Sequence, residues 1–190
     1  TIGALSGTGL VTVASTLTVG RNDADSVFSG VLAGAYGFYK TGAGRLDLTS
    51  DKSTFTGTIR VNGGELALSG NGKLLNTGNT AFTLVENEVL HLDNAEVNLT
   101  DRLTGAAPGV TFNGGTLRFT GKDGAASSET LGRPDFALNA STIEVINGSG
   151  TGSSAELTFG TAIASATPNG SLNLTAQNGT LGTAGDNPRV

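Results

Sequence analysis

The side chains that most often hold metals or attack substrates are scarce in this sequence. Its one histidine is His91, and it contains no cysteine. A zinc site of the usual nitrogen and sulfur type is therefore excluded, and a serine–histidine–aspartate triad would have to use His91. No nucleophile-elbow sequence is present to supply the serine. Because His91 stands between Leu90 and Leu92 in a predicted strand, we expect it to face outward as an ordinary surface histidine.

Carboxylates are the remaining candidates for acid–base chemistry, and along the chain they look scattered. Enzymes that cleave polysaccharides group such acids on one exposed groove. Here they stand at predicted corners or in separate strands, as do Asp23, Asp25, Asp47, Glu86, Glu88, Glu144 and Glu156. We interpret them as solvated surface groups, which makes a polysaccharide-degrading enzyme the least favoured function. The run Asn22-Asp23-Ala24-Asp25 leaves open a calcium ion held by oxygen ligands, although the EF-hand spacing is missing.

Two glycine-rich runs, Gly7-Thr8-Gly9 and Gly42-Ala43-Gly44, superficially resemble phosphate-binding loops. Neither leads into a predicted helix, so both are interpreted as chain corners and no cofactor is predicted. Tyr36, Phe38 and Tyr39 stand close together. We interpret them as a core phenylalanine with flanking surface tyrosines, and a sugar-stacking patch is the alternative.

The elements that must position these side chains are short strands between glycine-rich turns. The best-patterned stretch is 28–68, where polar and apolar residues alternate in Arg45–Leu48, Thr58–Val61 and Glu65–Leu68. Leu46 and Leu66 lie twenty positions apart. A fixed period near twenty predicts the coils of a solenoid, with Leu46 stacked on Leu66. No window shows a sustained helical stripe, so we expect almost no α-helix.

We therefore predict an all-β fold, a parallel β-helix (β-solenoid) of roughly nine coils, forming a single domain over residues 1–190. Glycine and asparagine suit its corners, since tight corners require positive φ. The rhythm breaks in 121–135, where a polar run is followed by Pro134, and proline cannot sit in a central ladder. We expect a lateral excursion from the solenoid over 121–135.

Residues 28–68 contain a series of short motifs, Phe28-Ser29-Gly30-Val31-Leu32, Lys40-Thr41-Gly42-Ala43-Gly44, Leu46-Asp47-Leu48, Phe55-Thr56-Gly57, Val61-Asn62-Gly63-Gly64 and Leu66-Ala67-Leu68. In this order and spacing the motifs resemble the autotransporter-associated β-strand repeat of bacterial surface proteins. Arg45 and Ile59 depart from it, since small hydroxyl residues are more usual there. The resemblance implies a right-handed parallel β-helix in the exported passenger of an outer-membrane autotransporter, or in a similar giant surface protein. It implies no catalytic residues.

Charge and hydropathy narrow the range of partners. A net charge of −5 argues against nucleic acid and against electrostatic attachment to anionic lipid. No run of eighteen apolar residues is present, so no transmembrane helix is predicted. We expect a secreted or cell-surface structural segment of a longer protein, acting as a passenger or stalk. Its partners would be neighbouring copies or domains of the same long chain, with end-to-end association into a fibre as a variant.

A second hypothesis is an adhesin that recognises a glycan or a host surface. The predicted excursion is the place where such a partner would be met. The candidate partner surface there consists of Lys122, Asp123, Glu129, Arg133 and Asp135.

Overall fold

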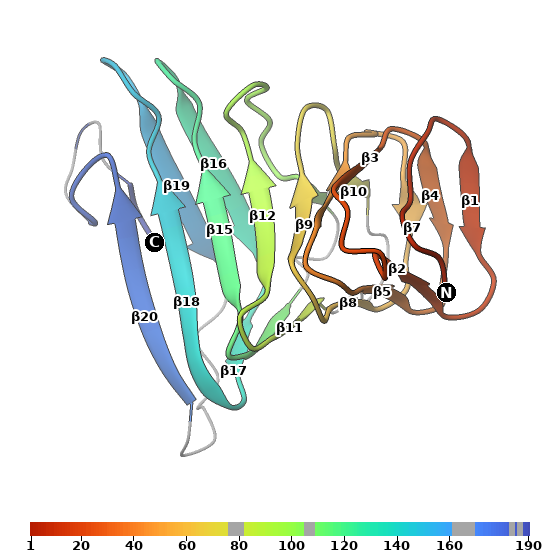
Figure 1. Cartoon of the computed structure of the whole chain (residues 1–190). Coiled ribbons are helices and arrows are strands. Elements are labelled where there is room, and N and C mark those ends of the chain that lie inside the picture. Colours follow the sequence, from red (N-terminus) through yellow and green to blue (C-terminus); the bar gives the residue numbers. More distant parts are fainter. Residues whose placement is uncertain (76–81, 105–108, 161–169, 183–184, 186–187) are drawn as a thin grey trace.

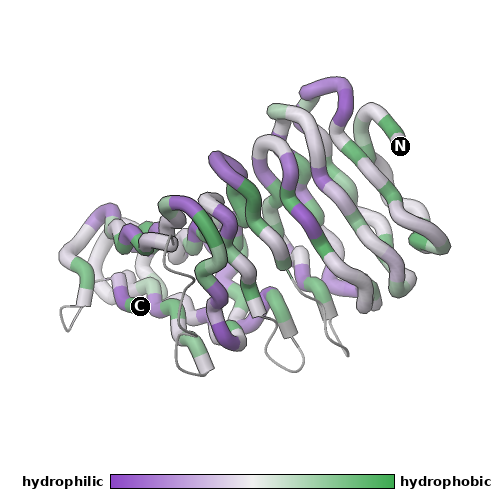
Figure 2. The backbone as a smooth tube through the Cα atoms, turned by 90° about the horizontal axis from the view of Figure 1, so that it is seen from below, coloured by the Kyte–Doolittle hydropathy of each residue, from purple (hydrophilic) through white to green (hydrophobic). Residues whose placement is uncertain are grey.

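The structure is a computed structural model that describes residues 1–75, 82–104, 109–160, 170–182, 185 and 188–190. Within these residues the chain forms twenty strands and no helix, and every strand pairs in parallel with its neighbours (Figure 1). The chain visits three sides in turn, and successive turns lie side by side (Figure 2). The predicted all-β solenoid is confirmed. No described helix is long and apolar enough to cross a membrane.

The first side is a seven-stranded sheet. Its strands, in chain order, are β3 (Ser26–Phe28), β6 (Arg45–Leu48), β9 (Glu65–Leu68), β12 (Val89–Asp93), β15 (Thr116–Thr120), β18 (Asn139–Ile146) and β20 (Gly170–Gln177). The second side is a six-stranded sheet made of β2 (Leu17–Val19), β5 (Phe38–Lys40), β8 (Ile59–Val61), β11 (Phe82–Val85), β14 (Val110–Asn113) and β17 (Pro134–Phe136).

The third side is divided into three separate sheets. These are β1 (Leu10–Val13), β4 (Val31–Gly34) and β7 (Thr54–Phe55), then β10 (Leu74–Leu75) and β13 (Leu103–Thr104), and finally β16 (Ala126–Leu131) and β19 (Ser154–Phe159). Short strands on all three sides follow from the short alternating runs in the sequence, because each run is long enough for only one side of a turn.

The prediction of nine coils is wrong, because the turns lengthen along the chain. The residues stacked on one another in the first sheet are Ser26, Leu46, Leu66, Leu90, Leu117, Ile143 and Leu174. The first two turns are equal in length, every later turn is longer, and the turn from Ile143 to Leu174 is the longest. The described residues therefore form about six turns. The predicted stacking of Leu46 on Leu66 is confirmed.

The core is the interior of the solenoid, filled by ladders of inward-facing side chains. Leu66, Leu90 and Leu117 stack in the first sheet and are completely buried. Phe112 and Phe136 stack between the last turns, with ring centroids 4.9 Å apart. Such a ladder buries apolar surface in every turn, and each Å² that is removed from water stabilises the fold by about 25 cal/mol.

The extra length of the later turns lies partly in loops at the corner that follows the first side. The segments 94–102, 121–125 and 147–153 lie there, each between a strand of the first side and the next strand of the third. They are tied together: Lys122 Nζ donates to the carbonyl of Glu96 at 2.7 Å, and the amide of Ser149 donates to Asp123 Oδ1 at 2.7 Å.

The predicted lateral excursion over 121–135 is wrong for most of its length. Only 121–125 forms part of the stacked loops, whereas β16 and β17 are paired strands of the solenoid. Pro134 is tolerated because it is the first residue of β17, and β17 is the last strand of its sheet in the described residues.

Candidate functional site

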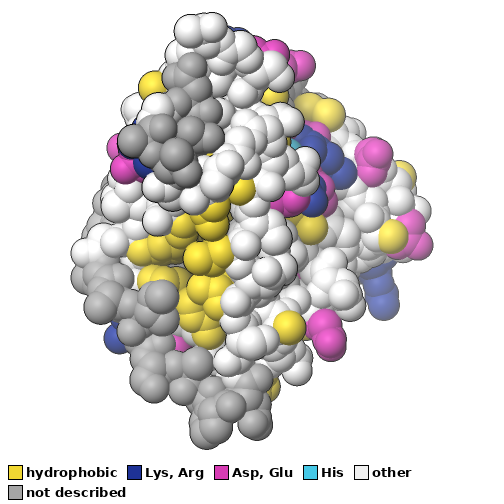
Figure 3. All heavy atoms as spheres, turned by 90° about the vertical axis from the view of Figure 1, so that its left-hand side faces the viewer, with side chains coloured by type: hydrophobic (Ala, Val, Ile, Leu, Met, Phe, Trp, Pro, Cys, Tyr) yellow, Lys and Arg dark blue, Asp and Glu magenta, His cyan; other side chains and the backbone are white. Residues whose placement is uncertain are grey.

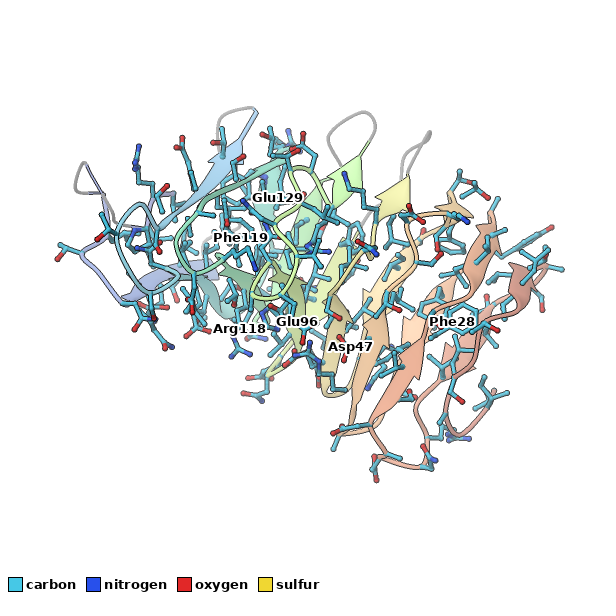
Figure 4. All side chains as sticks on the ribbon, turned by 90° about the horizontal axis from the view of Figure 1, so that it is seen from above. Phe28, Asp47, Glu96, Arg118, Phe119 and Glu129 are labelled. Atoms are coloured by element: carbon cyan, nitrogen blue, oxygen red, sulfur yellow. The ribbon has the colours of Figure 1, made fainter. Side chains whose placement is uncertain are left out.

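Stacking of the first sheet gathers charged side chains that are far apart in the sequence. Asp47, Ala67, His91, Arg118 and Glu144 are consecutive rungs on the outward face of this sheet. Beside them lie further charged residues, and the whole group, named here the charged ladder, is Arg45, Asp47, Glu65, His91, Asp93, Arg118 and Glu144. Asp47 and Arg118 lie on the same side of the molecule in Figure 4.

Arg45 is the centre of this group. It donates two hydrogen bonds to Asp47, from Nε to Oδ2 at 2.7 Å and from Nη2 to Oδ1 at 2.8 Å. Its Nη1 lies 2.6 Å from Glu65 Oε1, on the next turn, and its Nη2 lies 3.3 Å from Asp93 Oδ2. The hydrogen bond to Asp47 is the main reason that the pKa of Arg45 is raised.

Arg118 extends the group toward the C-terminus. Its Nε lies 2.6 Å from Glu144 Oε2, and its Nη1 lies 3.4 Å from Glu65 Oε2. Burial by itself raises the pKa of Glu65, but the hydrogen bond and charge of His91, with the charges of Arg45 and Arg118, lower it overall. The same balance holds for Asp47, whose pKa is lowered by hydrogen bonds from Arg45 and Ser69 despite its burial.

His91 faces outward, as expected, but it is not an ordinary surface histidine. Only 7% of it is exposed, because it lies within the charged ladder. Its Nδ1 is 2.8 Å from Glu65 Oε1 and its Nε2 is 2.9 Å from Thr120 Oγ1. Thr120, His91 and Glu65 thus stand in the order of a nucleophile, a base and an orienting acid.

One hydrogen-bond donor that a hydrolytic site would use beside this chain of hydrogen bonds is occupied. Acyl transfer needs free hydrogen-bond donors for the developing oxyanion, and the amide that follows the nucleophile often supplies one. Here the amide of Gly121 donates to the carbonyl of Ile146 at 2.8 Å and is occupied by the ladder of strands. The arrangement balances buried charge and fixes the side chains on this face.

The grouping of the acids in the charged ladder is not apparent from the sequence, where they look scattered. The signal that reveals them is the predicted stacking itself. If Leu46 lies on Leu66, then Arg45 must lie on Glu65, because both pairs share one register. The lengthened turns hide the other members, since the steps that bring His91 and then Arg118 into the ladder are both longer than the period of the first turns.

The predicted partner surface is only partly on the surface. Glu129 is completely buried in β16, so its inclusion was wrong. Asp123 and Arg133 are exposed, whereas Lys122 and Asp135 are partly buried. These four residues remain a predicted partner surface.

The candidate calcium-binding run Asn22–Asp25 has a structural role. At the Asn22–Asp25 corner, Asp23 Oδ1 accepts the amide of Ala43 at 2.8 Å and Asp25 Oδ1 accepts the amide of Arg45 at 2.7 Å. Nowhere in the described part of the chain do three or more His, Cys, Asp or Glu residues form a group suited to a metal ion.

In the aromatic cluster, the predicted core phenylalanine and the surface position of Tyr36 are confirmed, whereas Tyr39 is half-buried. Phe38 is completely buried and meets Phe55 edge-to-face, with ring centroids 6.2 Å apart. Tyr36 is 58% exposed.

Comparison with known proteins gives two matches. Residues 38–68 match the family model described as passenger-associated-transport-repeat. The chain is also 36% identical over 110 residues to the adhesin BmaC autotransporter of Brucella suis biovar 1 (strain 1330). That match covers 57% of this chain and 3% of the relative, so the chain spans only a small part of the relative's length. No solved structure matches the chain.

Proposed function

The chain carries an autotransporter passenger repeat and is a secreted, cell-surface protein, and from this premise we propose that residues 1–190 form one structural segment of a surface passenger or stalk. The observation that carries the proposal is the continuous stacking of the first side from β3 to β20 and of the second side from β2 to β17. Each turn presents unpaired backbone groups and apolar side chains that the next turn covers, so each turn acts as a template for its successor.

The partners that fit such a segment best are neighbouring turns of the same long chain. At the C-terminal end of the solenoid, β20 and β17 are the last described strands of their sheets. Figure 3 shows apolar side chains gathered on this end. The solenoid has a hollow of about 660 Å³ here. Its lining includes Phe136, Ile143, Leu157, Leu172 and Leu174. A further turn of similar width would continue both sheets and cover these side chains.

Identical copies of this segment are poorly matched for end-to-end stacking. The first sheet begins with the three-residue β3 and a short turn, and it ends with the eight-residue β20 and the longest turn. A narrow end placed on a wide one leaves much of β20 unpaired. The fibre variant is therefore less favoured than a continuous stalk.

A pair of deletions tests whether a turn is the structural unit. Removing residues 46–65 deletes one turn and keeps the register of the first side. We expect a folded, β-rich protein with lowered stability. Removing 46–64 instead shifts the register by one position, which turns inward side chains outward, and we expect no cooperative folding. Circular dichroism and thermal unfolding distinguish the two variants. Equal behaviour of both would contradict a stacked structural segment.

An adhesive role is the second candidate, favoured by the similarity of the chain to part of an adhesin. Its surface would be the four residues Lys122, Asp123, Arg133 and Asp135. A glycan array and a cell-binding assay with the purified chain test it, using Lys122→Ala/Asp123→Ala against the exposed control pair Asp51→Ala/Lys52→Ala. Binding lost only in the first variant would support adhesion. If neither the parent chain nor its variants bind, the adhesive role is contradicted.

We further propose that the segment has no hydrolytic activity, because the amide of Gly121, which follows Thr120 and would be the expected oxyanion donor, is occupied by the carbonyl of Ile146. Incubation with polysaccharides and activated esters is expected to give no release of reducing ends or leaving group above background. Turnover that disappears in Thr120→Val would contradict this part of the proposal.

A further inference from the structure

The third side of the solenoid has a seam between β13 and β16, where side chains replace part of the backbone ladder. The amide of Arg102 donates to Glu129 Oε2 at 2.8 Å, and the amide of Leu103 donates to Glu129 Oε1 at 3.0 Å. In the opposite direction, the amide of Thr130 donates to Asp101 Oδ1 at 3.3 Å. Two carboxylates thus accept bonds that carbonyls accept in an ordinary parallel ladder.

Glu129 is an inward-facing residue of β16 and is completely buried. It stands between Ser127 and Leu131 on the inward face of its strand, and its parallel neighbour on β19 is Leu157. The one charged residue of β19 is Glu156, whose side chain is 49% exposed and faces outward. Figure 4 shows Glu129 among the densely packed side chains of the later turns.

Arg102 is also completely buried, but its guanidinium is not paired with Glu129. Its Nε donates to Asn94 Oδ1 at 2.6 Å, its Nη1 to the carbonyl of Gly72 at 2.8 Å and its Nη2 to the carbonyl of Val97 at 2.8 Å. The positive charge of Arg102 therefore acts on Glu129 through space only. A buried carboxylate without a direct cationic partner is costly to ionise.

The surroundings of Glu129 act on its protonation in opposite directions. Burial is the largest influence and raises the pKa of Glu129 to about 7, and the charge of Asp101 acts in the same direction. The two amide bonds and the charge of Arg102 oppose this rise. In a locally opened seam, water would solvate the carboxylate and return it toward its ordinary behaviour.

We propose that Asp101, Arg102 and Glu129 form a proton-linked seam: because the closed seam buries Glu129 without a direct cationic partner, proton uptake by Glu129 favours the closed form and ionisation favours opening. The neutral acid keeps its carbonyl oxygen as the acceptor for one of the two amides. The closed seam binds the proton more strongly than the open or unfolded chain does. By linkage, a fall in pH favours the closed form and a rise in pH favours opening. The contact between these two turns is then weaker at alkaline pH than in mild acid.

The direct test is a nuclear magnetic resonance titration of the intact chain between pH 5.5 and 8.5. We expect the side-chain carboxyl of Glu129 and the amides of Arg102 and Leu103 to titrate together with a midpoint near 7. Asp101→Asn removes the neighbouring negative charge and is expected to lower that midpoint. A midpoint near 4.5, or amides that do not follow the carboxyl group, would overturn the proposal.

Stability measurements supply the second readout. Because the proton is bound by the folded chain and released on unfolding, the folded-to-unfolded ratio should fall roughly thirty-fold between pH 5.5 and 8.5 from this group alone. Glu129→Gln should lose this pH dependence of stability, whereas Glu156→Gln, on the adjacent strand, should keep it. The same pH dependence in Glu129→Gln and the parent chain would refute the seam. If Glu129→Gln does not fold, the titration of the parent chain decides.

Discussion

The Nη1 atom of Arg45 lies 2.6 Å from Glu65 Oε1, and the two residues are separated by one turn of the solenoid. Glu65 in turn contacts His91 at 2.8 Å and Arg118 at 3.4 Å, which belong to the next two turns. One carboxylate thus joins side chains from four successive turns. Half-buried charges that satisfy one another in this way resist solvent screening better than isolated surface pairs.

Glu65→Gln is expected to destabilise the chain by about 1–2 kcal/mol at pH 7, because Arg45, His91 and Arg118 lose a common negative charge and one of its two acceptor oxygens. The pKa of Glu65 is lowered in the folded chain, so its contribution is present above the unfolded pKa and is lost as the pH falls through the folded value. Urea unfolding at pH 7 and pH 3.5 measures this.

The exposed Glu86 supplies the control, as Glu86→Gln. The parent chain and the control should lose more stability in acid than Glu65→Gln does. An equal acid-dependent loss in all three proteins would show that Glu65 contributes nothing to the charged ladder.

The fold class could be predicted from the sequence because the first turns obey strict rules. Alternation fixes which side chains face inward, and the regular spacing of Leu46 and Leu66 fixes the register. The later turns obey the same alternation with longer corners. Spacing alone cannot count such turns, since loops such as 94–102 and 147–153 add residues without adding a turn.

Some members of the candidate site could be predicted from the sequence and others could not, again because of the register between turns. The contact of Arg45 with Glu65 follows from the register that stacks Leu46 on Leu66, but the positions of the carboxylates along the chain do not show it, because the two residues belong to different turns. The polar run that precedes Pro134 predicts a loop for Glu129. Its neighbours Ser127 and Leu131 show the alternation of a strand, and a buried acid at such a position indicates a specific polar role.

Alanine substitutions at Gly64 and Gly124 distinguish the cost of backbone strain from the cost of a steric clash, because the two glycines have nearly the same φ. Gly64 has φ of 63° and Gly124 has φ of 66°, so alanine is strained at both positions. A Cβ atom at Gly64 would lie 2.4 Å from the carbonyl oxygen of Ala43, whereas nothing lies within 4 Å of one at Gly124. We expect Gly124→Ala to cost about 1 kcal/mol and Gly64→Ala at least about 3 kcal/mol. Thermal unfolding compares them, and similar losses would show that turns need not pack so closely at this corner.

Lys40 offers the sharpest test of the corner between the second and first sides. It is 1% exposed, and its ammonium donates to the carbonyls of Thr41, Gly42 and Gly63, each at 2.9 Å. Its inward direction follows from the sequence, because it lies two residues after the buried Phe38 in the same strand. Burial lowers the pKa of Lys40, while the charges of four acids, led by Glu88, raise it.

Lys40→Met keeps the length of the side chain and removes the charge. Three carbonyls at a tightly packed corner then lose their donor, at a cost of about 1 kcal/mol or more for each. Relief from burying the ammonium offsets part of this, so we expect a net loss of about 2–3 kcal/mol and a fall in Tm of roughly 5–10 °C. Lys52→Met, at an exposed corner, should leave Tm unchanged. Equal Tm values for the two variants would mean that the carbonyls around Lys40 find other donors, and that the buried lysine does not hold the corner together.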